Sequence, residues 1–156
     1  MNAQLLHVKS DDPLHRLYMA EVYRWAKARP EAYLDGTGYD SREEFLEPPP
    51  GAQEFIVLLE GQPSALLTLL PLGGGEYGAG LIVSPTARIR RLMATLRCVR
   101  GWLPNAGVTA LRVVLPMNAC YDGARNMAAR LGFVQKATTD WKLEITDGNT
   151  RQAAGS

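Results

Sequence analysis

With 156 residues, the chain is long enough to form one domain with its own core. Hydrophobic residues make up 46% of it and charged residues 21%, which is ordinary for a globular protein and excludes an intrinsically disordered one. The formal net charge of +1, from 17 basic and 16 acidic side chains, gives no overall field for binding nucleic acids or membranes. The N-terminus lacks the pattern of a signal peptide, and no apolar run approaches the roughly 20 residues that cross a bilayer. We therefore expect a cytoplasmic protein with neither a membrane nor a nucleic-acid partner.

The N-terminal third of the chain predicts a strand and two helices. Residues 4–9 form the strand. Asp12 followed by Pro13 is typical of a capped helix start, and apolar residues recur at helical spacing from there to residue 27. A second, shorter helix starts at Ser41, where Ser-Arg-Glu-Glu forms a capping box, and it ends at the three prolines of residues 48–50.

The middle of the chain predicts three consecutive strands. Apolar runs at residues 54–60, 64–72 and 76–83 are separated by Gly-Gln-Pro and Gly-Gly-Gly turns. Because the connections are this short, we expect an antiparallel meander.

The second half alternates helices and strands. A helix begins at residue 86 and closes at Asn-Ala-Gly of residues 105–107, followed by a strand at 108–115, a helix at about 121–131 and a last strand at 133–145. This alternation predicts an α/β (α+β) fold with a mixed sheet and helices on both of its faces. We expect one domain over residues 1–146 and a flexible tail over residues 147–156.

Two motifs carry a resemblance to a known family. An alanine, Ala124, lies in a helix that ends at Leu131-Gly132-Phe133, and residues 81–85 read Leu-Ile-Val-Ser-Pro at the end of a strand. Together with the order of elements, these residues resemble the GCN5-related N-acetyltransferase (GNAT) superfamily over about residues 5–145. The resemblance implies a mixed, mostly antiparallel sheet flanked by about four helices.

The resemblance also implies a site for acetyl-CoA. In the family, the fourth and fifth strands splay apart and hold the pantetheine arm of the cofactor. Carried over to this chain, the backbone groups of Leu81, Ile82 and Val83 would hydrogen-bond the pantetheine amides.

The loop after the fourth strand departs from the family pattern. The family places small residues there, which let backbone N–H groups approach the pyrophosphate, but residues 88–93 place Arg91 and Met93 at those two positions. One interpretation is that Arg88, Arg90 and Arg91 contact the phosphates in place of part of the backbone. The other is a solvated basic helix face on a protein that no longer binds coenzyme A.

The catalytic positions are also altered. Ala128 stands where many family members have a tyrosine that protonates the leaving thiolate. The nearby Tyr121 is a candidate hydroxyl or a packing aromatic, and Glu76 is a candidate base or a hairpin-end glutamate that faces water. Cys98 and Cys120 lack the spacing of a zinc site, so we expect no metal.

Two functions follow from these observations. The first is an acyl-CoA-dependent N-acyltransferase that moves an acetyl group to an amine of a small molecule or a protein. The resemblance implies an acceptor site in residues 30–39, which contain Tyr33, Asp35 and Tyr39, and a plain loop explains the same residues. The alternative is a catalytically degenerate GNAT-fold module that binds no coenzyme A and serves as a protein-interaction component of an assembly, such as a phage particle. The arginines between residues 88 and 100 are too sparse to argue for a nucleic-acid site. The acceptor, the acyl chain and the oligomeric state are not indicated by the sequence.

Overall fold

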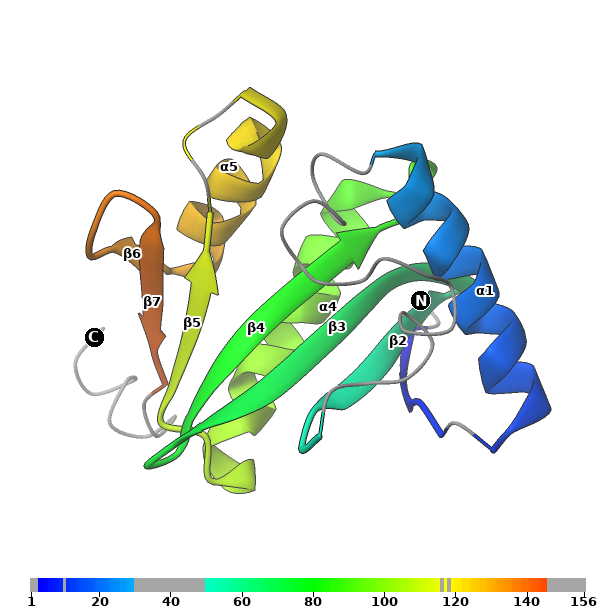
Figure 1. Cartoon of the computed structure of the whole chain (residues 1–156), viewed down its shortest axis with the longest axis horizontal. Helices are drawn as coiled ribbons and strands as arrows, with labels where there is room; N and C mark the ends of the chain where they lie inside the picture. The colour runs from blue at the N-terminus through cyan, green and yellow to red at the C-terminus, as the bar shows by residue number, and fades with distance from the viewer. Residues whose placement is uncertain (1–2, 10, 30–49, 116, 118, 146–156) are drawn as a thin grey trace. The chain divides into compact units, whose positions relative to one another are not determined.

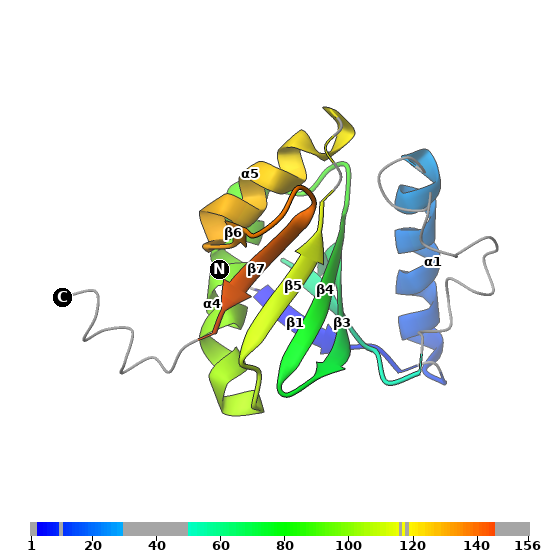
Figure 2. The same ribbon diagram turned by 60° about the vertical axis from the view of Figure 1, so that its left-hand side comes forward.

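The computed structural model describes residues 3–9, 11–29, 50–115, 117 and 119–145. These residues form seven strands, three α-helices and two short 3-10 helices (Figures 1 and 2). In chain order the elements are β1 (Ala3–His7), α1 (Pro13–Ala28), β2 (Gln53–Leu59), β3 (Gln62–Gly73), β4 (Glu76–Val83), α4 (Ile89–Trp102), η1 (Leu103–Ala106), β5 (Ala110–Val114), η2 (Ala119–Tyr121), α5 (Asp122–Leu131), β6 (Val134–Gln135) and β7 (Asp140–Glu144). Every helix in the described part is too short or too polar to span a bilayer.

Hydrogen bonds join the strands in the order β1-β2-β3-β4-β5-β7-β6. Contacts divide the described chain into two compact units. The first contains the described residues up to Leu70 together with Gly80–Leu92, and the second contains Pro71–Ala79 and the described residues from Met93 onward. Strands β3 and β4 and helix α4 therefore each contribute residues to both units.

In the first unit, β1 and β3 pair with β2 in antiparallel register. Alternate residues of a strand point to one face of the sheet, so Ile56 of β2 and its partner Leu66 of β3 lie on the same face. Helix α1 covers that face with apolar side chains at helical spacing. The buried cluster that results consists of Met19, Val22, Trp25, Ala26, Ile56, Leu58 and Leu66.

The start of α1 is determined locally, as the sequence predicts. The side chain of Asp12 accepts hydrogen bonds from the backbone N–H groups of Leu14 (2.9 Å) and His15 (3.3 Å), and Pro13 occupies the first turn. The buried His15 also accepts a hydrogen bond at Nδ1 from the backbone N–H of Lys9, at 2.8 Å. The helix therefore begins at a fixed place relative to the chain that leaves β1.

In the second unit, β4 and β5 are parallel, whereas β7 is antiparallel to both β5 and β6. Figure 2 shows β5, β7 and β6 side by side. Helix α5 ends at Gly132, whose φ of 101° is the left-handed conformation expected of a helix-ending glycine. Arg100 of α4 donates a hydrogen bond from Nη1 to the carbonyl of Leu131 at 2.5 Å, which ties α4 to the end of α5.

The turn between β3 and β4 requires glycine at one position in particular. Gly75 has a φ of 84°, and a Cβ placed there would lie 2.9 Å from Cγ2 of Thr109 and 3.0 Å from the carbonyl oxygen of Gly107. The backbone N–H of Thr109 donates to the carbonyl of Gly75 at 2.8 Å. The close approach of these two segments aligns the start of β5 beside β4.

The predicted fold class is confirmed: the sheet is mixed and mostly antiparallel, and helices accompany it. One prediction was wrong. The last strand, expected over residues 133–145, is two strands, because the backbone N–H of Lys136 donates to the carbonyl of Asp140 (2.7 Å) and reverses the chain between β6 and β7. The helix predicted from Ser41 and the tail at 147–156 lie outside the described residues, and the single domain over residues 1–146 stays a prediction.

The buried cluster makes a stability prediction within one strand. Leu66 is 2% exposed and Leu70, also in β3, is 37% exposed. Leu66→Ala should lower the free energy of unfolding by about 2–5 kcal/mol, because it removes buried methyl groups and leaves a cavity. Leu70→Ala should lower it by less than about 1 kcal/mol. Urea unfolding measures both, and equal losses would contradict the placement of Leu66 in the core.

Candidate functional site

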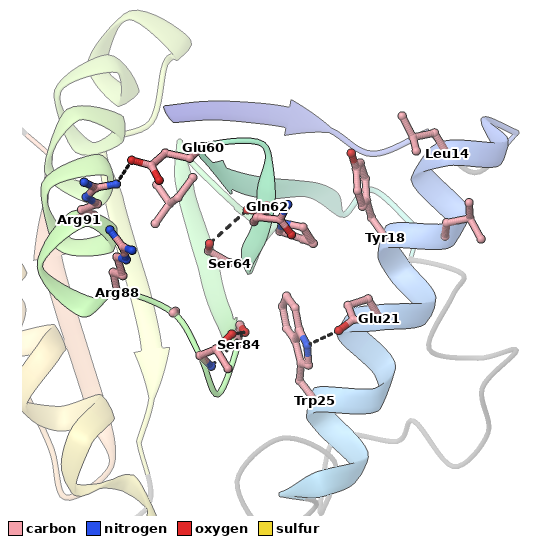
Figure 3. Close-up of a pocket in the computed structure, with 15 residues that line it drawn as sticks. Leu14, Tyr18, Glu21, Trp25, Glu60, Gln62, Ser64, Ser84, Arg88 and Arg91 are labelled. Carbon is pink, nitrogen blue, oxygen red and sulfur yellow. Dashed lines mark hydrogen bonds and ion pairs between the residues drawn. The ribbon is translucent and has the colours of Figure 1, made fainter. Parts of the chain in front are cut away.

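A hollow of about 610 Å³ lies in the first unit (Figure 3). It is bordered by α1, by the turn between β2 and β3, by the end of β4 and by the start of α4. Its lining combines aromatic rings, carboxylates, hydroxyls and guanidinium groups. The polar and aromatic side chains among these are Tyr18, Glu21, Trp25, Glu60, Gln62, Ser64, Ser84, Thr86, Arg88 and Arg91.

Ser84 organises the junction between β4 and α4. Its backbone N–H donates to the carbonyl of Ser64 at the start of β3 (2.9 Å), and its own carbonyl accepts from the N–H of Ala87 (3.1 Å). Its buried side-chain oxygen accepts from the N–H of Thr86 at 3.2 Å. These three bonds form a tight turn, so that Arg88 and the first turn of α4 face the hollow.

Arg91 forms an ion pair with Glu60 on the side of the hollow that faces α1, as Figure 3 shows. Glu60 lies in the turn between β2 and β3 and has a φ of 53°, an uncommon value for a residue other than glycine. A hydrogen bond from Arg91 lowers the pKa of Glu60, and the nearby charge of Arg88 adds to this effect. Glu60 is therefore an ionised partner that holds the guanidinium of Arg91 in place.

We refer to Ser84, Thr86, Arg88, Arg91 and the first turn of α4 as the α4 corner. The first N–H groups of an α-helix have no partner within the helix, and the helix dipole is positive at that end. Guanidinium groups and hydroxyls add donors that match phosphate oxygens. The side chains present at the α4 corner therefore suit a phosphate group.

The two residues that depart from the family loop occupy different surroundings. Met93 is only 4% exposed, so its side chain lies in the interior. Arg91 is half-buried and directed at Glu60. The exposed Arg90 is not among the residues that line the hollow. Leu81, Ile82 and Val83 are half-buried and are the last three residues of β4.

The opposite wall of the hollow belongs to α1. Trp25 donates a hydrogen bond from Nε1 to Oε1 of Glu21 at 3.1 Å, and Glu21 also forms an ion pair with Arg24. Tyr18 lies about two turns before Trp25 on the same wall (Figure 3). This wall is an aromatic surface with a carboxylate that is already engaged.

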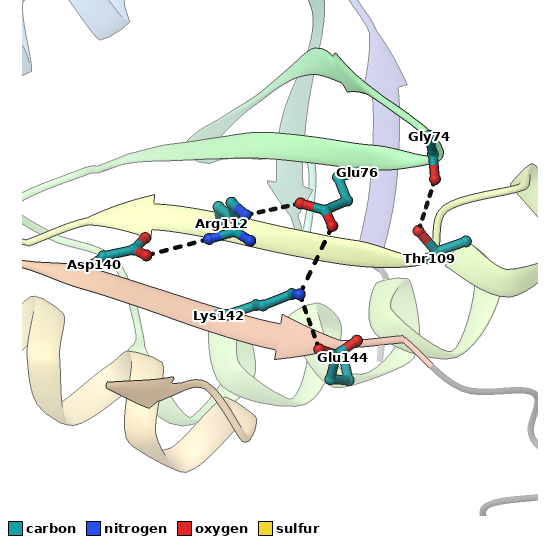
Figure 4. A network of polar contacts seen from close by, with 7 residues as sticks. All are labelled: Gly74, Glu76, Thr109, Arg112, Asp140, Lys142 and Glu144. Atoms are coloured by element: carbon teal, nitrogen blue, oxygen red, sulfur yellow. Dashed lines mark hydrogen bonds and ion pairs between the residues drawn. The ribbon is translucent and has the colours of Figure 1, made fainter. Parts of the chain in front are cut away.

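Glu76, the predicted base, belongs to a charged network in the second unit (Figure 4). Arg112 donates from Nε to Oε1 of Glu76 at 2.7 Å, and Nζ of Lys142 lies 3.7 Å from its Oε2. Arg112 and Lys142 in turn pair with Asp140 (3.2 Å) and Glu144 (3.0 Å). The hydrogen bond from Arg112 is the main cause of a lowered pKa at Glu76. A paired carboxylate of low basicity is a weak proton acceptor, so this geometry does not favour the predicted role.

Tyr121, the other predicted catalytic residue, ends η2 and precedes the first residue of α5. It follows β5, whereas Glu76 pairs in register with Ala110 at the start of β5. The structure therefore places the two residues at opposite ends of β5 and does not bring them together. Ala128, at the position of the family's tyrosine, is 7% exposed. The roles of Glu76 and Tyr121 stay predictions.

Sequence reasoning missed a buried carboxylate in the first unit. Glu54 of β2 is 6% exposed, and its Oε2 accepts a hydrogen bond from Oγ1 of Thr68 at 3.4 Å. Its Oε1 is buried without a hydrogen-bond partner among the described residues. Burial raises the pKa of Glu54 to about 7, and the bond from Thr68 lowers it by less. Period-two spacing could have found this residue, because Glu54 alternates onto the same face as the buried Ile56. The acceptor segment expected at residues 30–39 lies outside the described part.

Comparisons with known proteins support the fold. No protein-family model matches the sequence, and no curated protein does. Solved structures match instead. An acetyltransferase from Desulfovibrio desulfuricans that is assigned to the GNAT family gives a TM-score of 0.67 at 16% identity, over 93% of this chain and 100% of that one.

Two named acetyltransferases give similar values. The spermidine/spermine N-acetyltransferase SpeG from Vibrio cholerae gives a TM-score of 0.68 at 10% identity, over 96% of this chain and 99% of that one. RimL, a ribosomal L7/L12 alpha-N-protein acetyltransferase in complex with coenzyme A, gives 0.68 at 12% identity, over 93% and 95%. The chain therefore has the GNAT fold, as the motifs in its sequence predict.

The buried carboxylate makes a prediction for the protein without any ligand. Because the pKa of Glu54 rises from 4.5 to about 7 on folding, the folded state keeps its proton where the unfolded chain has lost it. The contribution of Glu54 to the stability is thus fully present below pH 4.5 and is lost as the pH rises through 7. Glu54→Gln removes this loss. The free energy of unfolding of the variant, relative to that of the native protein, should therefore rise by about 3 kcal/mol from below pH 4.5 to above pH 7.

Chemical denaturation at a series of pH values measures this difference. Glu144→Gln is the matched control, because Glu144 is an exposed carboxylate at the end of β7 and its removal should show no such rise. A constant difference between Glu54→Gln and the native protein over this pH range would mean that Glu54 is hydrated in solution.

Proposed function

We propose that this chain, which has the GNAT fold, is an acyl-CoA-dependent N-acyltransferase that moves an acetyl group to an amine of a small molecule or a protein. The observation that carries the proposal is the α4 corner. It combines Arg88 and Arg91 with the first turn of a helix beside a hollow of about 610 Å³. In this fold, an anion site at that place suits the phosphates of coenzyme A.

The residues that would hold the cofactor lie in the first unit. Backbone groups of Leu81, Ile82 and Val83 would hydrogen-bond the pantetheine amides, and Arg88, with Arg90 and Arg91, would contact the phosphates. Bound acetyl-CoA would supply a thioester as the acyl donor. Glu60 holds the guanidinium of Arg91 beside the hollow, where it would contact the phosphates.

The nature of the acceptor is supported by what the similar structures are named for. SpeG is named for spermidine and spermine, and RimL for the alpha-amine of a ribosomal protein. Both acceptors are amines.

Two observations favour a second candidate, a GNAT-fold module that binds protein partners and no coenzyme A. The ion pair between Arg91 and Glu60 engages a group that the cofactor would need. The buried Ala128 leaves no proton donor at the position of the family's tyrosine. A stoichiometric complex with a protein partner, together with no binding of coenzyme A, is the result that this candidate predicts.

Calorimetry with acetyl-CoA tests the first proposal. The native protein should bind the cofactor, and Arg88→Glu should weaken the affinity by about tenfold to a hundredfold, because a charge-assisted contact is replaced by repulsion. Arg97→Glu is the matched control, since Arg97 is exposed further along α4 and should leave the affinity unchanged. No heat of binding with the native protein at millimolar cofactor would end the proposal.

A further inference from the structure

Three residues form a row across β2, β3 and β4 in the first unit. Glu54 pairs in register with Thr68, and a Cβ built on Gly80 would meet Cβ of Thr68 at 3.9 Å. The row continues the face that carries Ile56 and Leu66, on which Ile82 of β4 also packs. The Thr68 side chain therefore has the buried carboxylate on one side and a strand position without a side chain on the other.

The position of Gly80 is open to solvent. Gly80 is exposed, and its Cβ would make no contact shorter than the ordinary 3.9 Å contact with Thr68. Its φ lies outside the left-handed region, so the backbone conformation does not by itself require glycine. An open strand position beside a hydroxyl and a carboxylate is a place where a polar group of a substrate can dock.

The environment of Glu54 offers its carboxylate little compensation. On one side of Glu54 lies the apolar Val8, which follows β1 and whose N–H donates to the carbonyl of Glu54. On the other side lie Thr68 and then Gly80. The elements packed on this face contribute the apolar buried cluster, against which Tyr18 and Tyr23 of α1 are partly buried. Oε1 has no hydrogen-bond partner among the described residues. Leaving a buried polar atom unpaired is costly, so each such atom calls for an explanation, and a catalytic role is one of them.

We propose that Glu54 is the proton acceptor for the attacking amine, that the proton reaches it through the hydroxyl of Thr68, and that the amine docks over Gly80. This inference rests on the proposed acyltransferase function. It assigns the task of the base to a residue of the first unit in place of Glu76.

The proton transfer balances in these terms. As the C–N bond to the acetyl group forms and the C–S bond breaks, the electron pair of that bond leaves on sulfur, which takes a proton from solvent. The amine proton passes to Oγ1 of Thr68 while the hydroxyl proton of Thr68 passes to Oε2 of Glu54. The carboxyl group then returns its proton to solvent.

The acidity of the two carboxyl groups supports the assignment. A base works best when its pKa lies near the working pH. Burial raises the pKa of Glu54 to about 7, whereas the hydrogen bond from Arg112 lowers that of Glu76. Near neutral pH, Glu54 can therefore both take up and release a proton, and Glu76 stays paired and ionised.

A titration without substrate is the first test. Carbon-13 NMR follows the glutamate carboxyl signals of the native protein, Glu54→Gln and Thr68→Val. The signal that Glu54→Gln lacks should titrate near pH 7 in the native protein. In Thr68→Val it should titrate at higher pH, because the lost hydrogen bond had lowered the pKa. Titration of Glu54 at its ordinary value of 4.5 in the native protein overturns the proposal.

Kinetics provide the second test. The release of CoA from acetyl-CoA is measured on both sides of pH 7, once with spermidine as the acceptor and once with a peptide that has a free N-terminus. Glu54→Gln should lower kcat about a hundredfold or more and abolish the pH dependence near 7. Thr68→Val should lower kcat in the same direction. The dissociation constant for acetyl-CoA, from calorimetry, should not change in either variant. Glu144→Gln should match the native protein in every measurement.

The two proposals fail in different ways. If Glu54→Gln binds acetyl-CoA and keeps the native kcat and pH profile, the role of Glu54 is wrong and the acyltransferase function stands. If the native protein binds no acetyl-CoA, the acyltransferase function fails, and this role for Glu54 fails with it even where its carboxyl titrates near pH 7.

The docking position has its own steric test. Gly80→Ala should raise KM for the amine severalfold and leave the affinity for acetyl-CoA unchanged. Gly101→Ala, at a glycine of α4 whose added Cβ would also meet no close atom, should leave KM unchanged. An unchanged KM in Gly80→Ala would place the amine elsewhere.

Discussion

The hydrogen bond from the N–H of Ser84 to the carbonyl of Ser64 is the constraint on which the candidate site depends. It ties the end of β4 to the start of β3, and the side-chain and backbone bonds of Ser84 then turn the chain within three residues. Because α4 begins directly after this turn, the bond decides where the positive end of the helix lies. Arg88 and Arg91 follow this turn, and Arg91 then pairs with Glu60 in the turn between β2 and β3.

The protein uses its carboxylates in two ways, and the difference is one of solvation and partners. Glu60 and Glu76 are accessible and paired with arginine, so both stay ionised and their negative charge holds a guanidinium in place. Glu54 is buried with a hydroxyl as its partner, so its charged form is disfavoured. A buried carboxylate such as Glu54 suits chemistry that needs a proton acceptor near neutral pH. A paired, accessible carboxylate such as Glu60 or Glu76 is better suited to holding a cation in place.

The altered loop of this chain becomes intelligible in three dimensions. A small residue is expected where backbone must approach a phosphate, and Met93 replaces one. The side chain of Met93 is buried, so it packs in the interior and does not cover the surface at the start of α4. Arg91 replaces the other small residue with a cation, and Glu60 holds that cation beside the hollow. The loop thus places side-chain charge where the family has small residues.

The sequence by itself determined the local elements. The predicted bounds of β4 match the structure at residues 76–83, α1 starts at Pro13 behind the Asp12 cap, and α5 ends at Gly132, because periodicity, capping and left-handed glycine are properties of a few neighbouring residues. Only the tertiary structure decided the charge environment of the site. Arg91 meets Glu60 across 31 residues and Arg112 meets Glu76 across 36, and the burial of Glu54 depends on strands and a helix that are distant along the chain. Register between strands and packing against helices set these contacts, and no local pattern encodes which partner a side chain will meet.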